Sequence, residues 1–256
     1  MATTTEGRDL TNAHRIQQVI IGQDTQQEAT LLTDTYLTTP APDRTAWLAA
    51  MLLMASSRWR QSQRLAAAYL HEFDHAENAP VGGSVVELRF PDARAVTMLT
   101  DLIPAPLVAE LEEPLEQELV RTVAAEAGKL AMTGGRSTID LTSRRRRVRY
   151  RRVSDGNPCA FCAMLAQSGP RYSEETAYFR AHPDCGCTAE PVYGIWQPTA
   201  LERKWVDAYD DAAEAARKAG EPLLAPHGRQ RRDTILWRMR RLHPELFSDG
   251  IYPKAA

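Results

Sequence analysis

All four cysteines of this 256-residue chain lie in one short segment, which also contains a histidine. The segment has a Cys-x-x-Cys pair and, nineteen residues later, the sequence His-Pro-Asp-Cys-Gly-Cys. A Cys-x-x-Cys pair places two thiolates on one edge of a tetrahedron, and a distant pair of donors completes many zinc sites. We therefore expect one structural zinc ion, with one donor more than four-coordinate zinc needs. The candidate ligands are Cys159, Cys162, His182, Cys185 and Cys187.

Two other states of these cysteines are compatible with the pattern. They could form two disulfides in an oxidising compartment, or they could be ordinary buried thiols. The first ten residues are polar and include acidic side chains, so we expect no secretory signal. A chain made and kept in a cytoplasm retains reduced thiols, which favours a metal over disulfides.

Composition indicates an ordinary water-soluble globular protein, with 43% hydrophobic and 25% charged residues. The longest apolar run, residues 46–55, is too short to span a bilayer, so no membrane association is expected. The formal net charge of −2 conceals one strongly basic segment. Length alone is compatible with one large domain or two small ones.

The clearest secondary-structure signal is a helix over residues 43–77. Its large and small apolar residues recur at steps of three and four, which is typical of one buried helical stripe. The stripe consists of Trp47, Met51, Ala55, Trp59, Ser62, Ala66, Tyr69 and Phe73. A helix of this length suits a bundle or an extended assembly protein better than a compact enzyme domain.

The rest of the chain is also expected to be largely helical. We expect disorder over residues 1–11 and a strand over Val85–Phe90, and we expect Gly134-Gly135 to end a helix that begins near Pro106. Thr199 and Glu202 form a capping-box pattern. Further helices are predicted at 12–37, 91–102, 162–167, 173–179, 201–220 and 233–242, with a closing strand at 188–193.

The predicted fold is therefore mainly α with a small α+β Cys/His (zinc-binding-like) module. Three parts are expected along the chain. They are a helical N-terminal domain (1–136), the Cys/His module (137–196) and a helical C-terminal tail (197–256).

A basic run precedes the cysteines and is the main candidate for partner binding. Clustered arginines neutralise phosphates without reading sequence, so nucleic acid is one expected partner. The alternatives are an acidic protein partner, or the chain's own acidic residues between Glu110 and Glu118. The run contains Arg144, Arg145, Arg146, Arg147, Arg149, Arg151 and Arg152.

Two enzymatic alternatives stay open. His75-Ala76-Glu77 and Pro158-Cys159-x-x-Cys162 match the two halves of the zinc deaminase signature, but they lie far apart and leave the later donors without a role. A protease is the other alternative, although no G-x-S-x-G elbow or H-E-x-x-H helix is present. We expect no catalytic activity.

Residues 151–193 resemble a known family of phage proteins. The matching sequences are R-R-V-S-D-G-N-P-C-A-F-C-A-M-L-A-Q-S-G-P-x-Y and A-H-P-D-C-G-C-T-A-E-P-V-Y. They are similar to the C-terminal module of Mu-F-like minor capsid (head morphogenesis) proteins of tailed phages, in the form found in phages that infect actinobacteria. Family members commonly end in H-P-x-C-R-C, whereas this chain has Gly186 at the arginine position.

The resemblance implies a low-copy structural protein of the phage head. Its location would be the head interior of the virion, and the host cytoplasm during assembly. Its partners would be the phage portal and capsid proteins, with non-specific contact to packaged DNA. Some related modules are described as capsid maturation proteases, which is the enzymatic alternative that the resemblance itself carries.

Overall fold

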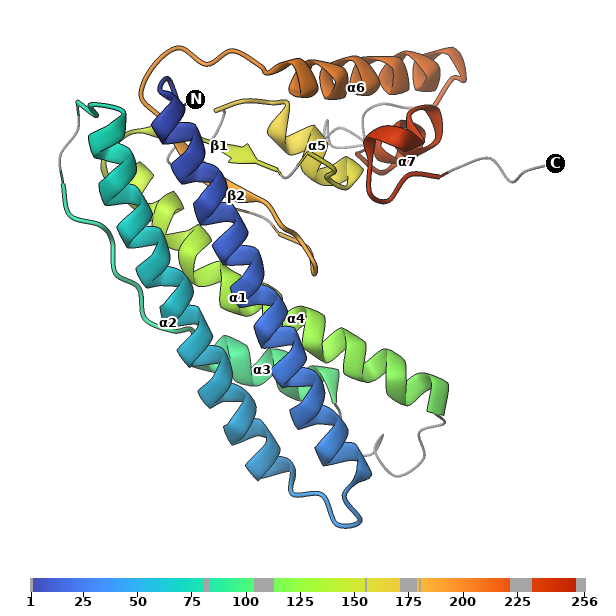
Figure 1. Ribbon diagram of the computed structural model, residues 1–256. Helices are drawn as coiled ribbons and strands as arrows, with labels where there is room; N and C mark the ends of the chain where they lie inside the picture. Colours follow the sequence, from blue (N-terminus) through green and yellow to red (C-terminus); the bar gives the residue numbers. More distant parts are fainter. Residues whose placement is uncertain are drawn as a thin grey trace.

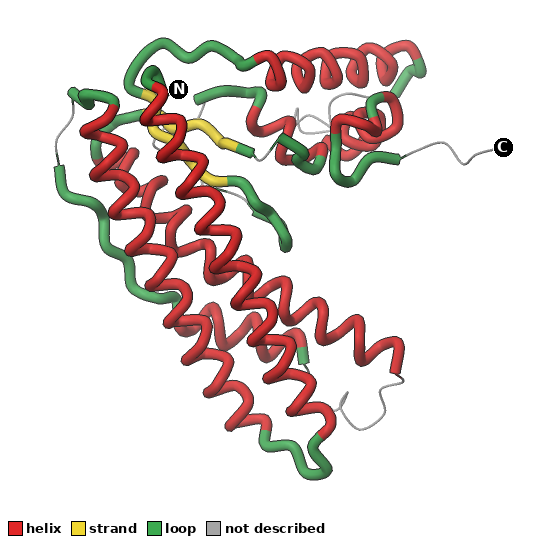
Figure 2. The backbone as a smooth tube through the Cα atoms, in the orientation of Figure 1, coloured by secondary structure: helices red, strands yellow, loops and turns green. Residues whose placement is uncertain are grey.

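The structure is a computed structural model of the chain that describes residues 2–80, 83–103, 113–154, 156–170, 179, 181–221 and 232–251. These residues are mostly helical with one small sheet, which confirms the expected class at that level (Figures 1 and 2). The elements are α1 (Thr5–Thr38), α2 (Arg44–Ala76), α3 (Asp92–Leu102), α4 (Glu113–Arg145), β1 (Arg149–Val153), α5 (Ala160–Ala166), β2 (Thr188–Val192), α6 (Ala200–Lys218), α7 (Arg232–Leu242) and a short 3-10 helix, η2 (Pro244–Leu246).

Three long helices, α1, α2 and α4, pack along one another as a bundle (Figure 1). The predicted stripe of α2 faces the inside of this bundle, and all eight of its residues are buried. The Asp43 side chain begins α2 by accepting hydrogen bonds from the backbone N–H groups of Thr45 and Ala46. The prediction of this helix from its apolar spacing is therefore confirmed.

The prediction that Gly134-Gly135 ends a helix is wrong, because α4 continues to Arg145. Both glycines lie inside the bundle, where the backbones of α2 and α4 approach closely. A Cβ atom on Gly134 would collide with the backbone oxygen of Trp59, and one on Gly135 would come within 2.8 Å of the Ser62 backbone oxygen. The glycines therefore permit close helix packing, which outweighs their weak helix propensity.

The N-terminal residues are ordered rather than disordered, so that prediction is also wrong. Thr4 begins α1 by accepting a hydrogen bond from the Gly7 N–H, and Glu77 accepts hydrogen bonds from Thr3 and Thr4. Ala2 is 1% exposed and donates its backbone N–H to Glu190 on β2. The start of the chain thus contacts both the end of α2 and the sheet.

Residues 85–90 do not form the predicted strand. Their backbone bonds to side chains of the bundle instead: Val86 N–H donates to Thr142 Oγ1, and the Leu88 oxygen accepts from Gln63. Phe90 is buried with its ring edge against Trp59, at a centroid distance of 5.9 Å. The alternating pattern reflects packing along the bundle, because no partner strand lies beside this segment in the described structure.

The small sheet and the last helices gather at one end of the bundle (Figure 1). β1 and β2 are antiparallel, with Arg151 opposite Glu190. The predicted capping box is present at the start of α6, between Thr199 and Glu202. α5, α6 and α7 pack together around Trp205 and Met239.

Most of the other predicted helices and the second predicted strand are present in the structure. The helices expected at 12–37, 91–102, 162–167, 201–220 and 233–242 and the strand at 188–193 are present with shifted ends. The predicted helix start near Pro106 and most of the predicted helix 173–179 lie outside the described residues. The boundary expected at residue 136 falls inside α4. This helix continues to Arg145 and so into the range expected for the Cys/His module (137–196).

Candidate metal centre

The first two cysteines are positioned by the start of α5. Cys159 is the N-cap residue, and its sulfur accepts a hydrogen bond from the backbone N–H of Cys162 at 3.4 Å. Cys162 lies in the first turn of the helix and is 2% exposed. A Cys-x-x-Cys pair arranged around a helix N-terminus points both sulfurs toward the same space, as the sequence pattern predicted.

The other three donors come from the loop that leads into β2. The backbone turns tightly at Asp184, which has a positive φ of 60°, and Gln26 of α1 donates a 2.8 Å hydrogen bond to its carboxylate. Cys185 and Cys187 follow this turn and are 4% and 3% exposed. The loop is thereby held against the bundle with its sulfurs facing inward.

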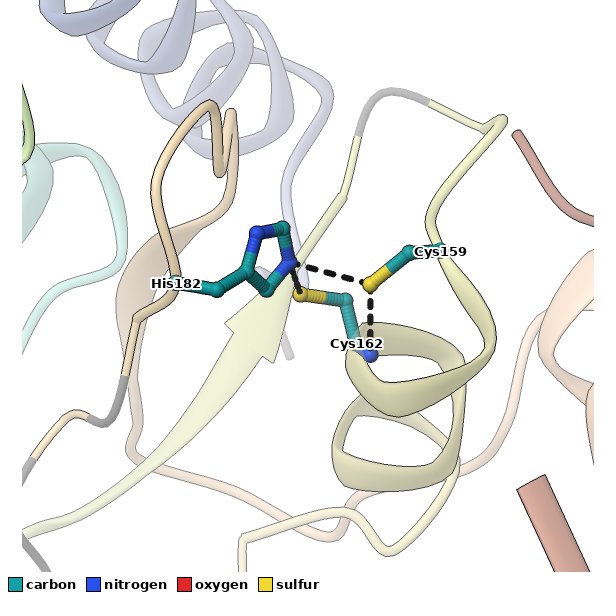
Figure 3. A group of neighbouring side chains, drawn as sticks. All are labelled: Cys159, Cys162 and His182. Carbon is teal, nitrogen blue, oxygen red and sulfur yellow. Dashed lines mark hydrogen bonds between the residues drawn. The ribbon is translucent and has the colours of Figure 1, made fainter. Parts of the chain in front are cut away.

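The five predicted donors come together in the structure as two overlapping groups. One group contains Cys159, Cys162 and His182, and the other contains Cys162, Cys185 and Cys187. Figure 3 shows His182 Nε2 facing two sulfurs, 3.0 Å from that of Cys159 and 3.3 Å from that of Cys162. These groups could hold a metal ion, and Cys162 belongs to both.

The sulfur separations fit shared coordination better than a disulfide. The Sγ atoms of Cys162 and Cys185 lie 3.6 Å apart, and all four cysteines are free thiols. Two thiolates on one tetrahedral zinc ion at a Zn–S distance of about 2.3 Å are separated by about 3.8 Å. A disulfide requires about 2.05 Å.

The orientation of His182 also fits a metal ligand. Its Nδ1 faces the backbone oxygen of Pro183, which can only accept a hydrogen bond, so Nδ1 carries the proton. Nε2 is then the nitrogen that faces the sulfurs and that would bind the metal. Metal-binding histidines commonly donate their second ring N–H to a carbonyl in this way.

Electrostatics favours deprotonated sulfur at two positions. The hydrogen bond from Cys162 lowers the pKa of Cys159 to about 5, and the hydrogen bond with Cys159 raises the pKa of His182 to about 9. Hydrogen bonds from Cys162 and Cys187, together with Arg136 and Arg152, hold the pKa of Cys185 well below its usual range. Thiolates are the form that binds metals.

Two buried arginines lie beside the sulfurs, and one of them was missed in the sequence. Arg136 of α4 donates to the backbone oxygens of Cys185 and Cys187, while Arg152 of β1 approaches the sulfurs of Cys162 and Cys185. Arg136 carries no motif, since it lies in a helix fifty residues before the donors it contacts. Only the fold reveals its position.

The basic run is split between the interior and the surface. Arg144 pairs with Asp140, Arg146 with Asp74, and Arg151 with Glu190 and Glu202. Among the acidic residues expected as partners, Glu110 and Glu112 lie outside the described residues. The side chains that are exposed, and so accessible to DNA or an acidic protein, are Arg145, Arg147 and Arg149. Binding by the run stays a prediction, restricted to these three.

The geometry gives the deaminase alternative no support. Among the described residues, neither group of close donors includes His75, which is exposed at the end of α2. Glu77, the expected general base, instead accepts hydrogen bonds from the backbone and side chains of Thr3 and Thr4. Burial is the largest single effect on the pKa of the Glu77 carboxyl and raises it, but the four hydrogen bonds together lower it by more. The net result is a lowered pKa.

Comparison with known proteins gives one family. The family model described as VG15 protein matches residues 3–219, which include the bundle, the donor cluster and α6. No curated protein and no solved structure matches the chain. Within the described part of the chain, no helix combines the length and the apolar character needed to cross a membrane.

Proposed function

Because the chain belongs to the VG15 family of phage proteins, we propose that it is a minor capsid, or head morphogenesis, protein of a tailed phage. It would act with the portal or the inner capsid during procapsid assembly and stay inside the head. The family match supports a phage protein, and the resemblance of residues 151–193 to Mu-F-like minor capsid proteins supports the role in the head.

The observation that carries a structural rather than catalytic role is the closure of the donor cluster. The donors are all Cys and His, they form two groups of three that share Cys162, and three of the sulfurs are at most 4% exposed. Catalytic zinc sites keep a coordination position for water or substrate, whereas structural sites are filled by Cys and His. The cluster therefore suits a structural zinc ion that fixes the loop of residues 182–187 to α5.

An interaction surface for this role is available next to the sheet. Arg147 and Arg149 border a cavity of about 690 Å³ that Tyr193 and Trp196 also line. Exposed arginines beside aromatic rings are typical of protein interfaces and of nucleic-acid contacts. An acidic surface of the portal or inner capsid would be the main partner, with packaged DNA as a weaker one.

Mass spectrometry of purified procapsids and virions tests the proposal. The protein is expected in both particles at a low and constant copy number, with its full mass. Absence from both would contradict the role in the head. A protein that is present in procapsids but cleaved or lost from virions would favour the maturation protease alternative.

A charge-matched pair of variants tests the interaction surface. Changing Arg145, Arg147 and Arg149 together to Gln is expected to lower incorporation into heads. Changing the exposed Lys204, Arg217 and Lys218 of α6 to Gln alters the net charge equally and should leave incorporation unchanged. Equal incorporation of both variants would show that Arg145, Arg147 and Arg149 are not needed for assembly into heads.

A salt titration separates the two partner classes. DNA affinity falls with salt at a slope of about −0.9 per phosphate contacted, because counterions are released. Binding to a protein surface that also includes apolar contacts should depend less on salt. We expect weak DNA binding by the purified chain. In the triple Gln variant the salt slope should become less steep, by at most the equivalent of about three phosphate contacts.

A further inference from the structure

Arg152 is fully buried directly against the donor cluster. It is 0% exposed, and its Nη1 lies 3.5 Å from the sulfur of Cys162 and 3.6 Å from that of Cys185. Its guanidinium carbon lies 4.0 Å from the centre of the Phe179 ring. One cationic nitrogen thus touches a sulfur from each half of the Cys/His pattern.

Arg136 of α4 also reaches the donor cluster. It is 3% exposed, its Nε–H donates to the backbone oxygen of Cys187 at 3.1 Å, and its Nη2 donates to that of Cys185. Its guanidinium carbon lies 5.4 Å from the Phe179 ring centre. Phe179 therefore covers both guanidiniums.

Burying two like charges side by side is costly unless anionic groups compensate them. Moving a single ion from water into a protein interior carries a large free-energy penalty even after the surroundings relax. The guanidinium of Arg136 has no carboxylate within ion-pair distance among the described residues, and its partners are the two cysteine carbonyls. The sulfurs of Cys162 and Cys185 lie beside the guanidinium of Arg152, and zinc bound by three or four thiolates carries a net negative charge.

We propose that Arg136 and Arg152 are positioning residues of the metal centre. They compensate the negative charge of the zinc–thiolate unit and hold the Cys185–Cys187 backbone in the ligating conformation. Arg152, by touching Cys162 and Cys185 together, assigns both of these sulfurs to the same ion. This inference rests on the zinc site of the proposed function and adds its outer supports.

Outer partners of metal ligands have a measurable effect on affinity. Their removal typically weakens metal binding by about 10- to 100-fold. In the full-length chain, Arg152→Met keeps most of the side-chain volume but removes the charge and the N–H groups. We expect zinc affinity, measured by competition with a chelator, to fall by about 10- to 100-fold.

Cobalt substitution gives a second measurement that a merely structural role would not change. The intensity of sulfur-to-cobalt charge-transfer absorption reports how many thiolates bind the ion. Arg152→Met should reduce this absorption in the metal-loaded protein. Arg152→Lys, which keeps the charge but loses the forked donor, should give an intermediate affinity.

The neighbouring Arg151 is the matched control. It lies on the same strand and is also buried, but its guanidinium pairs with Glu190 and Glu202 rather than with sulfur. Arg151→Met should lower stability while leaving the zinc affinity and the cobalt spectrum of the folded protein unchanged. If Arg152→Met fails to fold, Phe179→Leu tests the same site, because it uncovers both guanidiniums and should also weaken zinc binding.

The outcomes distinguish a failure of the arginine role from a failure of the zinc site on which it rests. If Arg152→Lys and Phe179→Leu bind zinc with the wild-type affinity and give the wild-type cobalt spectrum, the role of the arginines is overturned. The zinc site itself would still stand. A wild-type chain that binds neither zinc nor cobalt would overturn both. Neither result would contradict the proposed role in the phage head, which particle mass spectrometry tests separately.

Discussion

Arg136 of α4 donates its Nε–H to the backbone oxygen of Cys187 at 3.1 Å, across 51 residues of sequence. This bond joins α4, one of the three bundle helices, to the loop that supplies three of the five donors. Gln26 of α1 holds the same loop through Asp184. The donor cluster is therefore built against the bundle, and its order should depend on contacts from both sides.

The first prediction concerns the cysteine that both donor groups share. Cys162→Ser should abolish tight zinc binding and disorder the loop of residues 182–187, because both groups then lose a sulfur. The long helices should stay formed, since their core around Met51, Val123 and Ala127 is separate. Circular dichroism with amide hydrogen exchange would check this. Loss of all helical signal would instead show that the bundle cannot fold without the metal.

The second prediction concerns the buried ion pairs of Arg151. Its guanidinium bonds Glu190 and Glu202 at 2.7 Å each, and all three side chains are at most 8% exposed. Arg151→Met leaves two buried carboxylates without this cation, which should cost about 3–5 kcal/mol of unfolding free energy. Chemical denaturation would measure the loss. Arg145→Met at an exposed position should stay within about 0.5 kcal/mol of wild type, and equal effects would refute the assignment.

Much of the fold follows from the sequence, and the misses share one physical cause. The stripe of α2, the capping box at Thr199 and the gathering of the five donors depend on local spacing, which a sequence displays directly. The order of residues 2–4 depends on Glu77 and Glu190, which are distant in sequence. Local propensity cannot reveal partners that only the tertiary fold supplies.

The same limit explains the glycines and the arginines. Gly134 and Gly135 have weak helix propensity, but the approach of α2 makes their missing side chains an advantage. The basic run looks like one continuous charged surface in the sequence. Its alternate side chains point into different environments, because the run crosses from the end of α4 into β1.

The third prediction concerns helix packing at Gly135. Gly135→Ala would place a methyl group against Gln18 and within 2.8 Å of the Ser62 backbone oxygen. Overpacking of this kind should lower the unfolding free energy by about 1–3 kcal/mol, despite the better helix propensity of alanine. Ser137→Ala, two residues along at a half-buried position, is the control and should change stability by at most about 0.5 kcal/mol. A more stable Gly135→Ala variant would contradict the close contact.

The fourth prediction concerns a buried histidine. His14 is 4% exposed, stacks on Tyr69 at 4.4 Å and faces Gln18 and Thr188. Burial, together with the charge of Arg136, lowers the pKa of His14 from 6.5 to about 3. Between these pH values the unfolded chain binds a proton and the folded chain does not. Stability from this group is therefore complete above about pH 6.5 and is lost as the pH falls toward 3.

Denaturation at pH 7 and pH 5 would measure this dependence. His14 should account for a loss on the order of 2 kcal/mol between these values. His14→Gln retains polar contacts without a titrating ring, so its stability should fall less over the same range. The zinc site is common to both proteins, and the difference between them isolates His14. Parallel pH profiles would contradict neutral burial of this ring.

Native mass spectrometry of the purified full-length chain tests the zinc centre most directly. One zinc ion per chain is expected, and mild acid or a strong chelator should release it. The loop of residues 182–187 should become disordered when the ion is lost. Chelation should leave four reduced cysteines and the long helices in place. A metal-free protein with four reduced cysteines and the same ordered loop would contradict the centre.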